Sequence, residues 1–296
     1  AKLQQRKLDA LKRGIHRIAV DSQHPHGVHL VGVGAAGVQI VEATLRAAPP
    51  NLLDPAGSRM SVLAVDVGDG TLDGVRSAET ELPGDKIQVE ALALEMPSFG
   101  ELQQTVSGYV DFLKLEYPLY HPNPDSAAWL PRGDPAMEGS ISRAIAKAVY
   151  GRAYYDGGRP AFKALKRFAR SVEATGADSV VCIVFSLGES VGSGIALDLA
   201  RHLSSGLFGR RVLVVGVGIA PHHDDERALG AQLNTVFSEL DVLCDETKNK
   251  NVTVSCGDLF KNPFTAGFIM IPQPRRMSAA DAADFVRQRL ASLFVE

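Results

Sequence analysis

The sequence predicts an α/β fold in which a parallel β-sheet carries helices on both faces. Runs rich in Val, Ile and Leu are typical of strands buried on both sides, and they occur at 28–33, 61–70, 180–185 and 210–220. Segments with helical spacing of apolar residues alternate with these runs, which predicts parallel strands joined by helices. The 296-residue chain shows no internal repeat and no second composition regime, so we expect one α/β domain rather than two.

Each further element has its own signal in the sequence. Residues 1–19 repeat apolar side chains at spacings of three to five with basic residues between them, which predicts a basic helix. The stretch 117–135 is rich in proline and predicts a surface loop. Further helices are expected at 38–47, 140–155, 160–174, 194–203 and 226–240, and near the C-terminus after a capping Ser278. Short strands are expected at 241–244, 252–255 and 267–271.

Composition and charge exclude several classes of protein. The formal net charge is −3, so there is no electrostatic case for binding nucleic acid or a membrane surface. No apolar run is long enough for a membrane span. The three cysteines, Cys182, Cys244 and Cys256, lack the spacing of a disulfide framework or a zinc site. A reduced, cytoplasmic compartment is therefore expected.

The first candidate site is GVGAAG at 32–37, which fits GxGxxG between a predicted strand and a predicted helix. Glycines at such a turn let the backbone approach a phosphate, and the helix N-terminus supplies free N–H groups. Asp66 ends the next strand, where a dinucleotide-binding fold keeps an acid for the ribose. An NAD(P)-dependent oxidoreductase is therefore one open alternative, and a tight turn without a ligand is another.

The second candidate site is SLGESVGSG at 186–194, between another predicted strand and helix. Two glycine turns on separate strands suit a nucleotide whose phosphates are held from both sides. GESVG also matches the GxSxG pattern of serine hydrolases, but no histidine follows His223 in the chain. An α/β-hydrolase is therefore not expected.

These motifs resemble those of the tubulin and FtsZ superfamily. GAAGVQI at 34–40 is similar to the tubulin loop GQCGNQI, and SLGESVGSG is similar to the tubulin signature SLGGGTGSG. AVDVGDGTL at 64–72 resembles the FtsZ stretch AINTDAQAL. The resemblance implies a Rossmann-like domain that binds GTP or GDP, with Mg²⁺ as a candidate companion. It implies nucleotide contacts by Gly34, Ala35, Ala36, Gly37, Gln39 and Asp66 from one side, and by Gly188, Glu189, Ser190, Val191, Gly192, Ser193 and Gly194 from the other.

The domain organisation that follows has two parts. We expect residues 1–27 to form a basic helical extension and 28–296 to form a nucleotide-binding α/β domain. That domain contains a loop-rich insertion around 113–139 and a reduced C-terminal region. The assignment requires the two glycine turns to meet at one edge of the sheet and to leave room for a polyphosphate between them.

Departures from the family pattern lower the expected activity. Glu189 stands where the family has glycine, and Val191 where it has threonine. A carboxylate about 4 Å from a phosphate charge costs about 4 kcal/mol at an effective dielectric near 20. Glu189 therefore turns outward, or holds a bridging cation, or marks a lost triphosphate site.

The expected function is guanine-nucleotide binding with weak or absent GTPase activity. The family's acidic catalytic motif is not found, so no catalytic residue is assigned. The protein is expected to act in assembly, in switching or as a complex subunit, through self-association or a protein partner. A scaffold that binds no nucleotide is a further alternative.

PHHDDER at 221–227 follows a predicted strand, and three explanations compete for it. Adjacent histidines on a loop can share a metal. The resemblance implies a loop beside the ribose at this place. Carboxylates also suit the first turn of a helix. The sequence favours capping and solubility, so no metal ligand is assigned.

Overall fold

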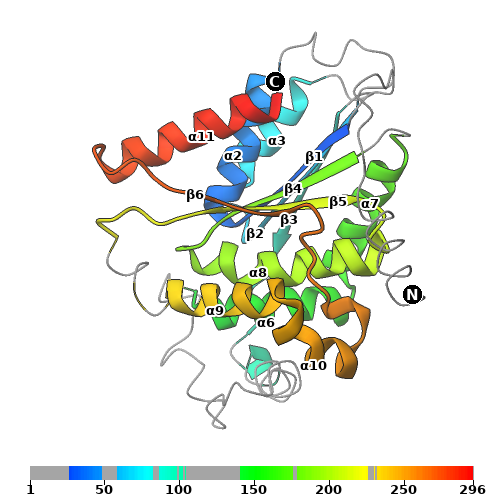
Figure 1. Ribbon diagram of the computed structural model, residues 1–296. Coiled ribbons are helices and arrows are strands. Elements are labelled where there is room, and N and C mark those ends of the chain that lie inside the picture. Colours follow the sequence, from blue (N-terminus) through cyan, green and yellow to red (C-terminus); the bar gives the residue numbers. More distant parts are fainter. Residues whose placement is uncertain are drawn as a thin grey trace, which may run out of the picture.

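The centre of the protein is a sheet of six parallel strands, shown in Figure 1, in a computed structural model that describes residues 27–48, 59–82, 87–98, 100–102, 104, 141–175, 179–225, 230 and 232–295. The strand order is β3-β2-β1-β4-β5-β6. The strands are β1 (Gly27–Val33), β2 (Met60–Val67), β3 (Ile87–Leu94), β4 (Ser179–Ser186), β5 (Leu213–Ile219) and β6 (Gly267–Ile271). The chain builds outward from β1 to β3 and then continues on the other side of β1, so the strand order reverses between β1 and β4. In doubly wound sheets this reversal is where ligands bind.

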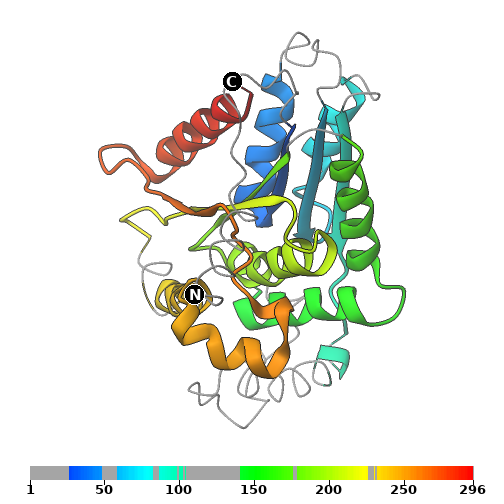
Figure 2. The ribbon, with the colours of Figure 1, turned by 45° about the vertical axis from the view of Figure 1, so that its right-hand side comes forward.

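Helices cover both faces of the sheet (Figures 1 and 2). One face carries α2 (Gly34–Ala47), α3 (Asp73–Thr80) and α11 (Ala279–Val295). The other carries α6 (Arg143–Tyr155), α7 (Pro160–Glu173), α8 (Ser190–Arg201) and α9 (Leu233–Cys244). A π-helical turn (His202–Leu207) extends α8, and α10 (Glu246–Cys256) follows α9. The structure therefore has the predicted α/β fold, with a Rossmann-like sheet between two helical layers.

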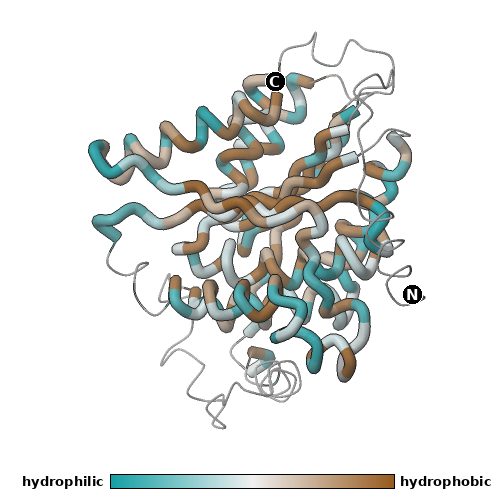
Figure 3. The backbone as a smooth tube through the Cα atoms, in the orientation of Figure 1, coloured by the Kyte–Doolittle hydropathy of each residue, from teal (hydrophilic) through white to brown (hydrophobic). Residues whose placement is uncertain are grey.

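Alternate residues of each strand supply the two layers of the core. Leu30 and Val184 are fully buried toward α2, whereas Val31 and Ile183 are fully buried toward α6 and α8. The central strands are hydrophobic along their length in Figure 3. Burial on both faces explains why these strands read as unbroken apolar runs in the sequence.

Two short strands expected from the sequence are helical instead. Residues 241–244 end α9, and 252–255 lie within α10. The Asp245 carboxylate accepts hydrogen bonds from the backbone N–H groups of Thr247 (2.8 Å) and Lys248 (3.2 Å) and so caps the start of α10. This cap and the helical context outweigh the strand preference of Val252 and Val254.

The predicted C-terminal helix is present as α11. Ser278 caps it as expected, because its Oγ accepts a hydrogen bond from the backbone N–H of Asp281 (3.2 Å). No strand was expected from the sequence at β3. As an edge strand it is half-covered, so its apolar residues do not form an unbroken run.

Both glycine motifs lie further inside helices than expected. α2 begins at Gly34 rather than near 38, and α8 begins at Ser190 rather than near 194. Their residues therefore form first helical turns with free N–H groups. The basic extension, apart from Gly27 of β1, and the insertion at 113–139 lie outside the described residues. None of the described helices has both the length and the apolar composition of a membrane span.

Candidate functional site

The two glycine turns meet at the carboxyl edge of the sheet. β1 and β4 are paired in register, with Val33 opposite Phe185, so both strands end at the same edge. Gly34 has a φ of +71°, and a Cβ there would lie 2.6 Å from the backbone nitrogen of Gly192. Only glycine fits this approach without strain. The structure thus brings together the two turns that the sequence analysis singled out.

The Glu189 side chain fills the space between the turns. Its Oε1 accepts a hydrogen bond from the backbone N–H of Ala35 (2.7 Å), and its Oε2 accepts one from Ala36 (3.2 Å). These donors belong to the first turn of α2, where helix geometry leaves N–H groups unpaired and the helix dipole favours an anion. The carboxylate therefore lies where a phosphate was expected, and the turns do not leave the room for a polyphosphate that the nucleotide assignment requires.

Asp66, near the end of β2, adds a second carboxylate beside Glu189 at the corner where the first turns of α2 and α8 meet. It is 5% exposed and accepts hydrogen bonds from the backbone N–H of Val67 (2.8 Å) and from Oγ1 of Thr71 (2.5 Å). Burial raises the pKa of the Asp66 carboxyl above its usual range, although these two hydrogen bonds lower it.

The pKa of Glu189 is also raised. Burial is the largest cause, the two bonds from α2 lower it, and the negative charge of Asp66 raises it further. Because Glu189 points into the corner between the helices, the alternative in which it turns outward is wrong. A polyphosphate would bring a third anionic group to these two.

Several residues of the second turn face the interior rather than the edge. Ser193 donates its backbone N–H (3.1 Å) and its hydroxyl (2.6 Å) to the carbonyl oxygen of Glu189. A Cβ on Gly194 would lie 2.8 Å from the carbonyl oxygen of Arg143, so this glycine allows α8 to pack closely on α6. Val191 packs against the core beneath α8. Helix packing accounts for Gly194 and Val191, and hydrogen bonding within the first turn of α8 accounts for Ser193.

The remaining predicted site residues are spread around the corner. Gly188 donates its N–H to Oγ of Ser186 (3.3 Å), and Ser190 Oγ accepts from Nε2 of Gln232 (3.4 Å). A Cβ on Gly37 would lie 2.3 Å from a carbonyl oxygen of β4, so this glycine serves helix-to-sheet contact. Gln39 is exposed.

A buried ionic network beneath α8 escaped the sequence analysis. Arg143 of α6 donates to Oε1 of Glu239 in α9 (2.9 Å), and Lys147 lies 2.9 Å from Asp198 of α8. Burial alone would raise the pKa of both Asp198 and Glu239, but the neighbouring cations together outweigh it and lower both pKa values. Arg143 also donates to the carbonyl oxygen of Ser193 (3.1 Å) and so ties the network to the second turn. The available signal was a pair of cations four residues apart, separated by apolar residues, at the start of a helix.

These features define a Rossmann-like α/β domain with two glycine turns at its topological switch point, joined by a carboxylate. No protein-family model matches the chain, and no curated protein matches it in sequence.

Among solved structures, the chain is similar to members of the tubulin/FtsZ family. CetZ from Methanosaeta thermophila strain DSM 6194 is 12% identical with a TM-score of 0.44, and the alignment covers 90% of this chain and 52% of that one. CetZ1 from Haloferax volcanii, a GDP-bound monomer, is 15% identical with a TM-score of 0.46 and coverages of 90% and 60%. TubZ of Clostridium botulinum phage c-st is 11% identical with a TM-score of 0.37 and coverages of 91% and 57%. The chain thus spans little more than half the length of these proteins. All three TM-scores are below 0.5, so the fold assignment rests on the sheet order.

Proposed function

We propose that this chain is a tubulin/FtsZ-like protein with a guanine-nucleotide site that Glu189 closes, and that it has weak or absent GTPase activity. It acts in assembly, in switching or as a complex subunit rather than in metabolic turnover. GTP or GDP enters only when the Glu189 side chain withdraws from α2.

One observation carries this proposal, namely the pair of hydrogen bonds from Ala35 and Ala36 to the Glu189 carboxylate. Anions bind at such helix starts because several N–H groups converge there with the helix dipole. The protein supplies its own anion at this point. This supports a site that retains the geometry for phosphate recognition and favours the closed state until a ligand competes.

Weak catalysis follows from the same corner. Phosphoryl transfer depends on positioned cations and donors that stabilise the growing negative charge. Two N–H donors in the first turn of α2 are already bonded to Glu189. The neighbouring Asp66 supplies a further carboxyl group rather than a cation. Val191 replaces the hydroxyl donor that the resemblance implies.

A scaffold without nucleotide is the second candidate, and the Glu189 contact also favours it. A permanent carboxylate satisfies the helix start without any ligand, in the way that acidic side chains stabilise helix N-termini elsewhere. An NAD(P)-dependent oxidoreductase has less support. The pyrophosphate of NAD(P) would need the N–H groups that bind Glu189. The Asp66 carboxylate, which would bind the ribose, already accepts a hydrogen bond from Thr71.

Calorimetry distinguishes these candidates. The full chain is titrated with GTP, GDP, ATP, NADH and NADPH, each with and without Mg²⁺. We expect weak binding of GTP and GDP, no binding of the dinucleotides, and little phosphate release from GTP above the protein-free rate. Binding of NADH without binding of guanine nucleotide would contradict the proposal. If no nucleotide binds even when Glu189 is replaced by glycine, the scaffold takes its place.

A further inference from the structure

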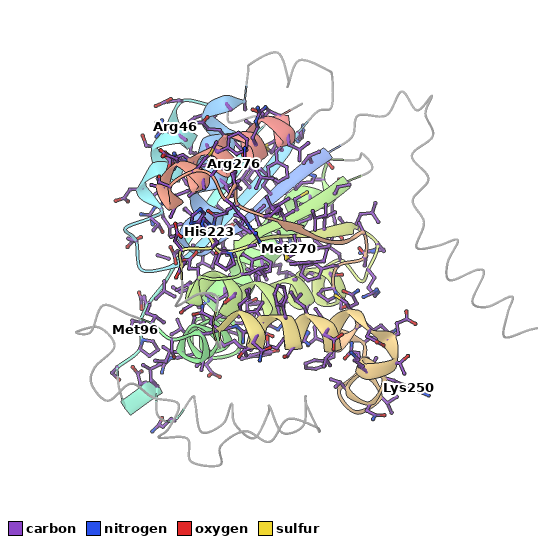
Figure 4. All side chains as sticks on the ribbon, turned by 60° about the vertical axis from the view of Figure 1, so that its left-hand side comes forward. Arg46, Met96, His223, Lys250, Met270 and Arg276 are labelled. Carbon is purple, nitrogen blue, oxygen red and sulfur yellow. The ribbon has the colours of Figure 1, made fainter. Side chains whose placement is uncertain are left out.

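The loop after β5 holds three side chains with metal-binding chemistry. His222, His223 and Asp224 follow the carboxyl end of β5, at the same edge of the sheet as the glycine turns. The base of the loop is fixed, because the Ala220 N–H donates to the carbonyl oxygen of Ile271 (2.9 Å). In Figure 4, His223 is labelled at the level of the sheet, between the two helical layers. The side chains therefore project from an anchored turn.

The spacing of the three side chains fits a shared ion. One ligand atom from each lies within 4.8 Å of the others. Nδ1 of His222 is 3.4 Å from a carboxylate oxygen of Asp224, and Nε2 of His223 is 3.2 Å from the other oxygen. Metal–ligand distances of about 2.0–2.1 Å in a tetrahedral site place neighbouring ligand atoms about 3.3–3.4 Å apart. The separation between Nε2 of His223 and the Asp224 carboxylate is therefore close to a tetrahedral edge before any ion is present.

The burial of His222 points in the same direction. Its side chain is 3% exposed, and among the described residues its Nε2 has no hydrogen-bond partner. A buried ring nitrogen without a partner usually has an ion or a water beside it. Because Nδ1 of the same ring accepts the backbone N–H of Asp224 (3.4 Å), Nε2 is the ring nitrogen left for an ion. By contrast, the side chains of His223 and Asp224 are 45% and 66% exposed, which leaves the cluster open to an ion from solution.

We propose that His222, His223 and Asp224 bind a borderline transition-metal ion, with Zn²⁺ as the best fit. Two imidazoles and one carboxylate suit Zn²⁺, Co²⁺ or Ni²⁺, whereas Mg²⁺ and Ca²⁺ prefer oxygen ligands alone. Three protein ligands leave a fourth tetrahedral position for water or for an oxygen atom of a bound molecule. The sequence favours capping and solubility for this loop, since the relative placement of the rings is not visible in it.

The test uses the untagged full chain, freed of metal with a chelator. Zn²⁺ binding is measured by calorimetry, and Co²⁺ is added separately to read ligand geometry from its visible absorption. We expect one ion per chain and a tetrahedral Co²⁺ spectrum. His223→Ala and Asp224→Asn are each expected to weaken Zn²⁺ binding at least about tenfold, since even the loss of a residue that only orients a ligand costs that much. Both positions are exposed, so folding should be unaffected, and circular dichroism checks this.

Asp225→Asn is the matched control, because Asp225 adjoins the cluster without belonging to it. It is expected to bind Zn²⁺ like the wild type. The proposal is overturned by any of three results: no saturable binding of Zn²⁺ or Co²⁺, an equal loss in Asp225→Asn, or effective competition by Mg²⁺. None of these outcomes depends on whether guanine nucleotide binds at the neighbouring corner.

Discussion

Replacing Glu189 with glycine should open the anion site at the start of α2. The change removes the carboxylate that accepts from Ala35 and Ala36 and keeps a residue that is tolerated at the N-cap of α8. Hydrogen bonds to charged groups contribute about 1.5–3 kcal/mol each, so withdrawing the carboxylate from two donors costs the wild type about 3 kcal/mol or more. That equals about two decades of affinity, at about 1.4 kcal/mol per decade. We therefore expect GDP and GTP to bind Glu189→Gly at least about 100-fold more tightly.

Two further variants separate charge from space. Glu189→Gln keeps one amide oxygen as an acceptor but loses the charge, so an intermediate gain in affinity is expected. Glu79→Ala removes an exposed carboxylate of α3 and should leave affinity unchanged. Calorimetry measures affinity, and thermal unfolding verifies that each variant is folded. Unchanged affinity in a folded Glu189→Gly protein would refute the closed-site reasoning, and weaker binding would instead indicate that Glu189 holds a useful cation.

Four further predictions concern stability, measured by chemical denaturation. Gly37→Ala should lower the free energy of unfolding by about 1–3 kcal/mol, because the new Cβ would lie 2.3 Å from a carbonyl oxygen of β4. Gly151→Ala in α6, where nothing lies within 4 Å, should raise it by up to about 1 kcal/mol, and a loss of equal size in both variants would contradict the argument. Lys147→Met should cost about 3–5 kcal/mol, since it leaves the buried carboxylate of Asp198 short of a cation; a cost near zero would show that water reaches the network. Burial lowers the pKa of His29 from 6.5 to about 4. The neutral ring therefore contributes fully to the free energy of unfolding above pH 6.5. As the pH falls toward 4 this contribution is lost, by about 3 kcal/mol in all. His29→Asn should make the free energy of unfolding less dependent on pH between about 6.5 and 4. An unchanged pH dependence would show that other groups cause it.

The strands at the centre of the sheet were predictable because burial on two faces leaves a simple pattern. β1 and β4 contain almost only apolar residues, and each is followed by a glycine turn and a helix. The exposed elements gave a mixed result, because the strand expected at 267–271 is present as β6 although much of it is exposed. By contrast, no strand is expected from the sequence at the edge strand β3, and the strand expected at 252–255 lies within α10, where Val254 is exposed. The strand preference of single residues has little influence on secondary structure where a capping side chain and neighbouring helices favour a helix.

The sequence also located the corner at which the turns meet, but it left the state of that corner open. It showed that Glu189 conflicts with a phosphate and allowed three resolutions. The direction of a side chain depends on donors 154 residues away, which no local pattern encodes. The same limit applies to His222 and His223, because adjacency in sequence does not tell which ring nitrogens face the neighbouring carboxylate.

Glu189 can cap the start of α2 only after β4 has paired with β1 during folding. β1 can pair with β2 soon after both are made, whereas its pairing with β4 must wait for more than a hundred further residues. Pairings distant along the chain form later, because the intervening segment must first lose its freedom. In a nascent or partly folded chain, α2 therefore presents uncapped N–H donors. At that stage we expect small anions in solution to bind these N–H donors as readily as the Glu189 carboxylate does.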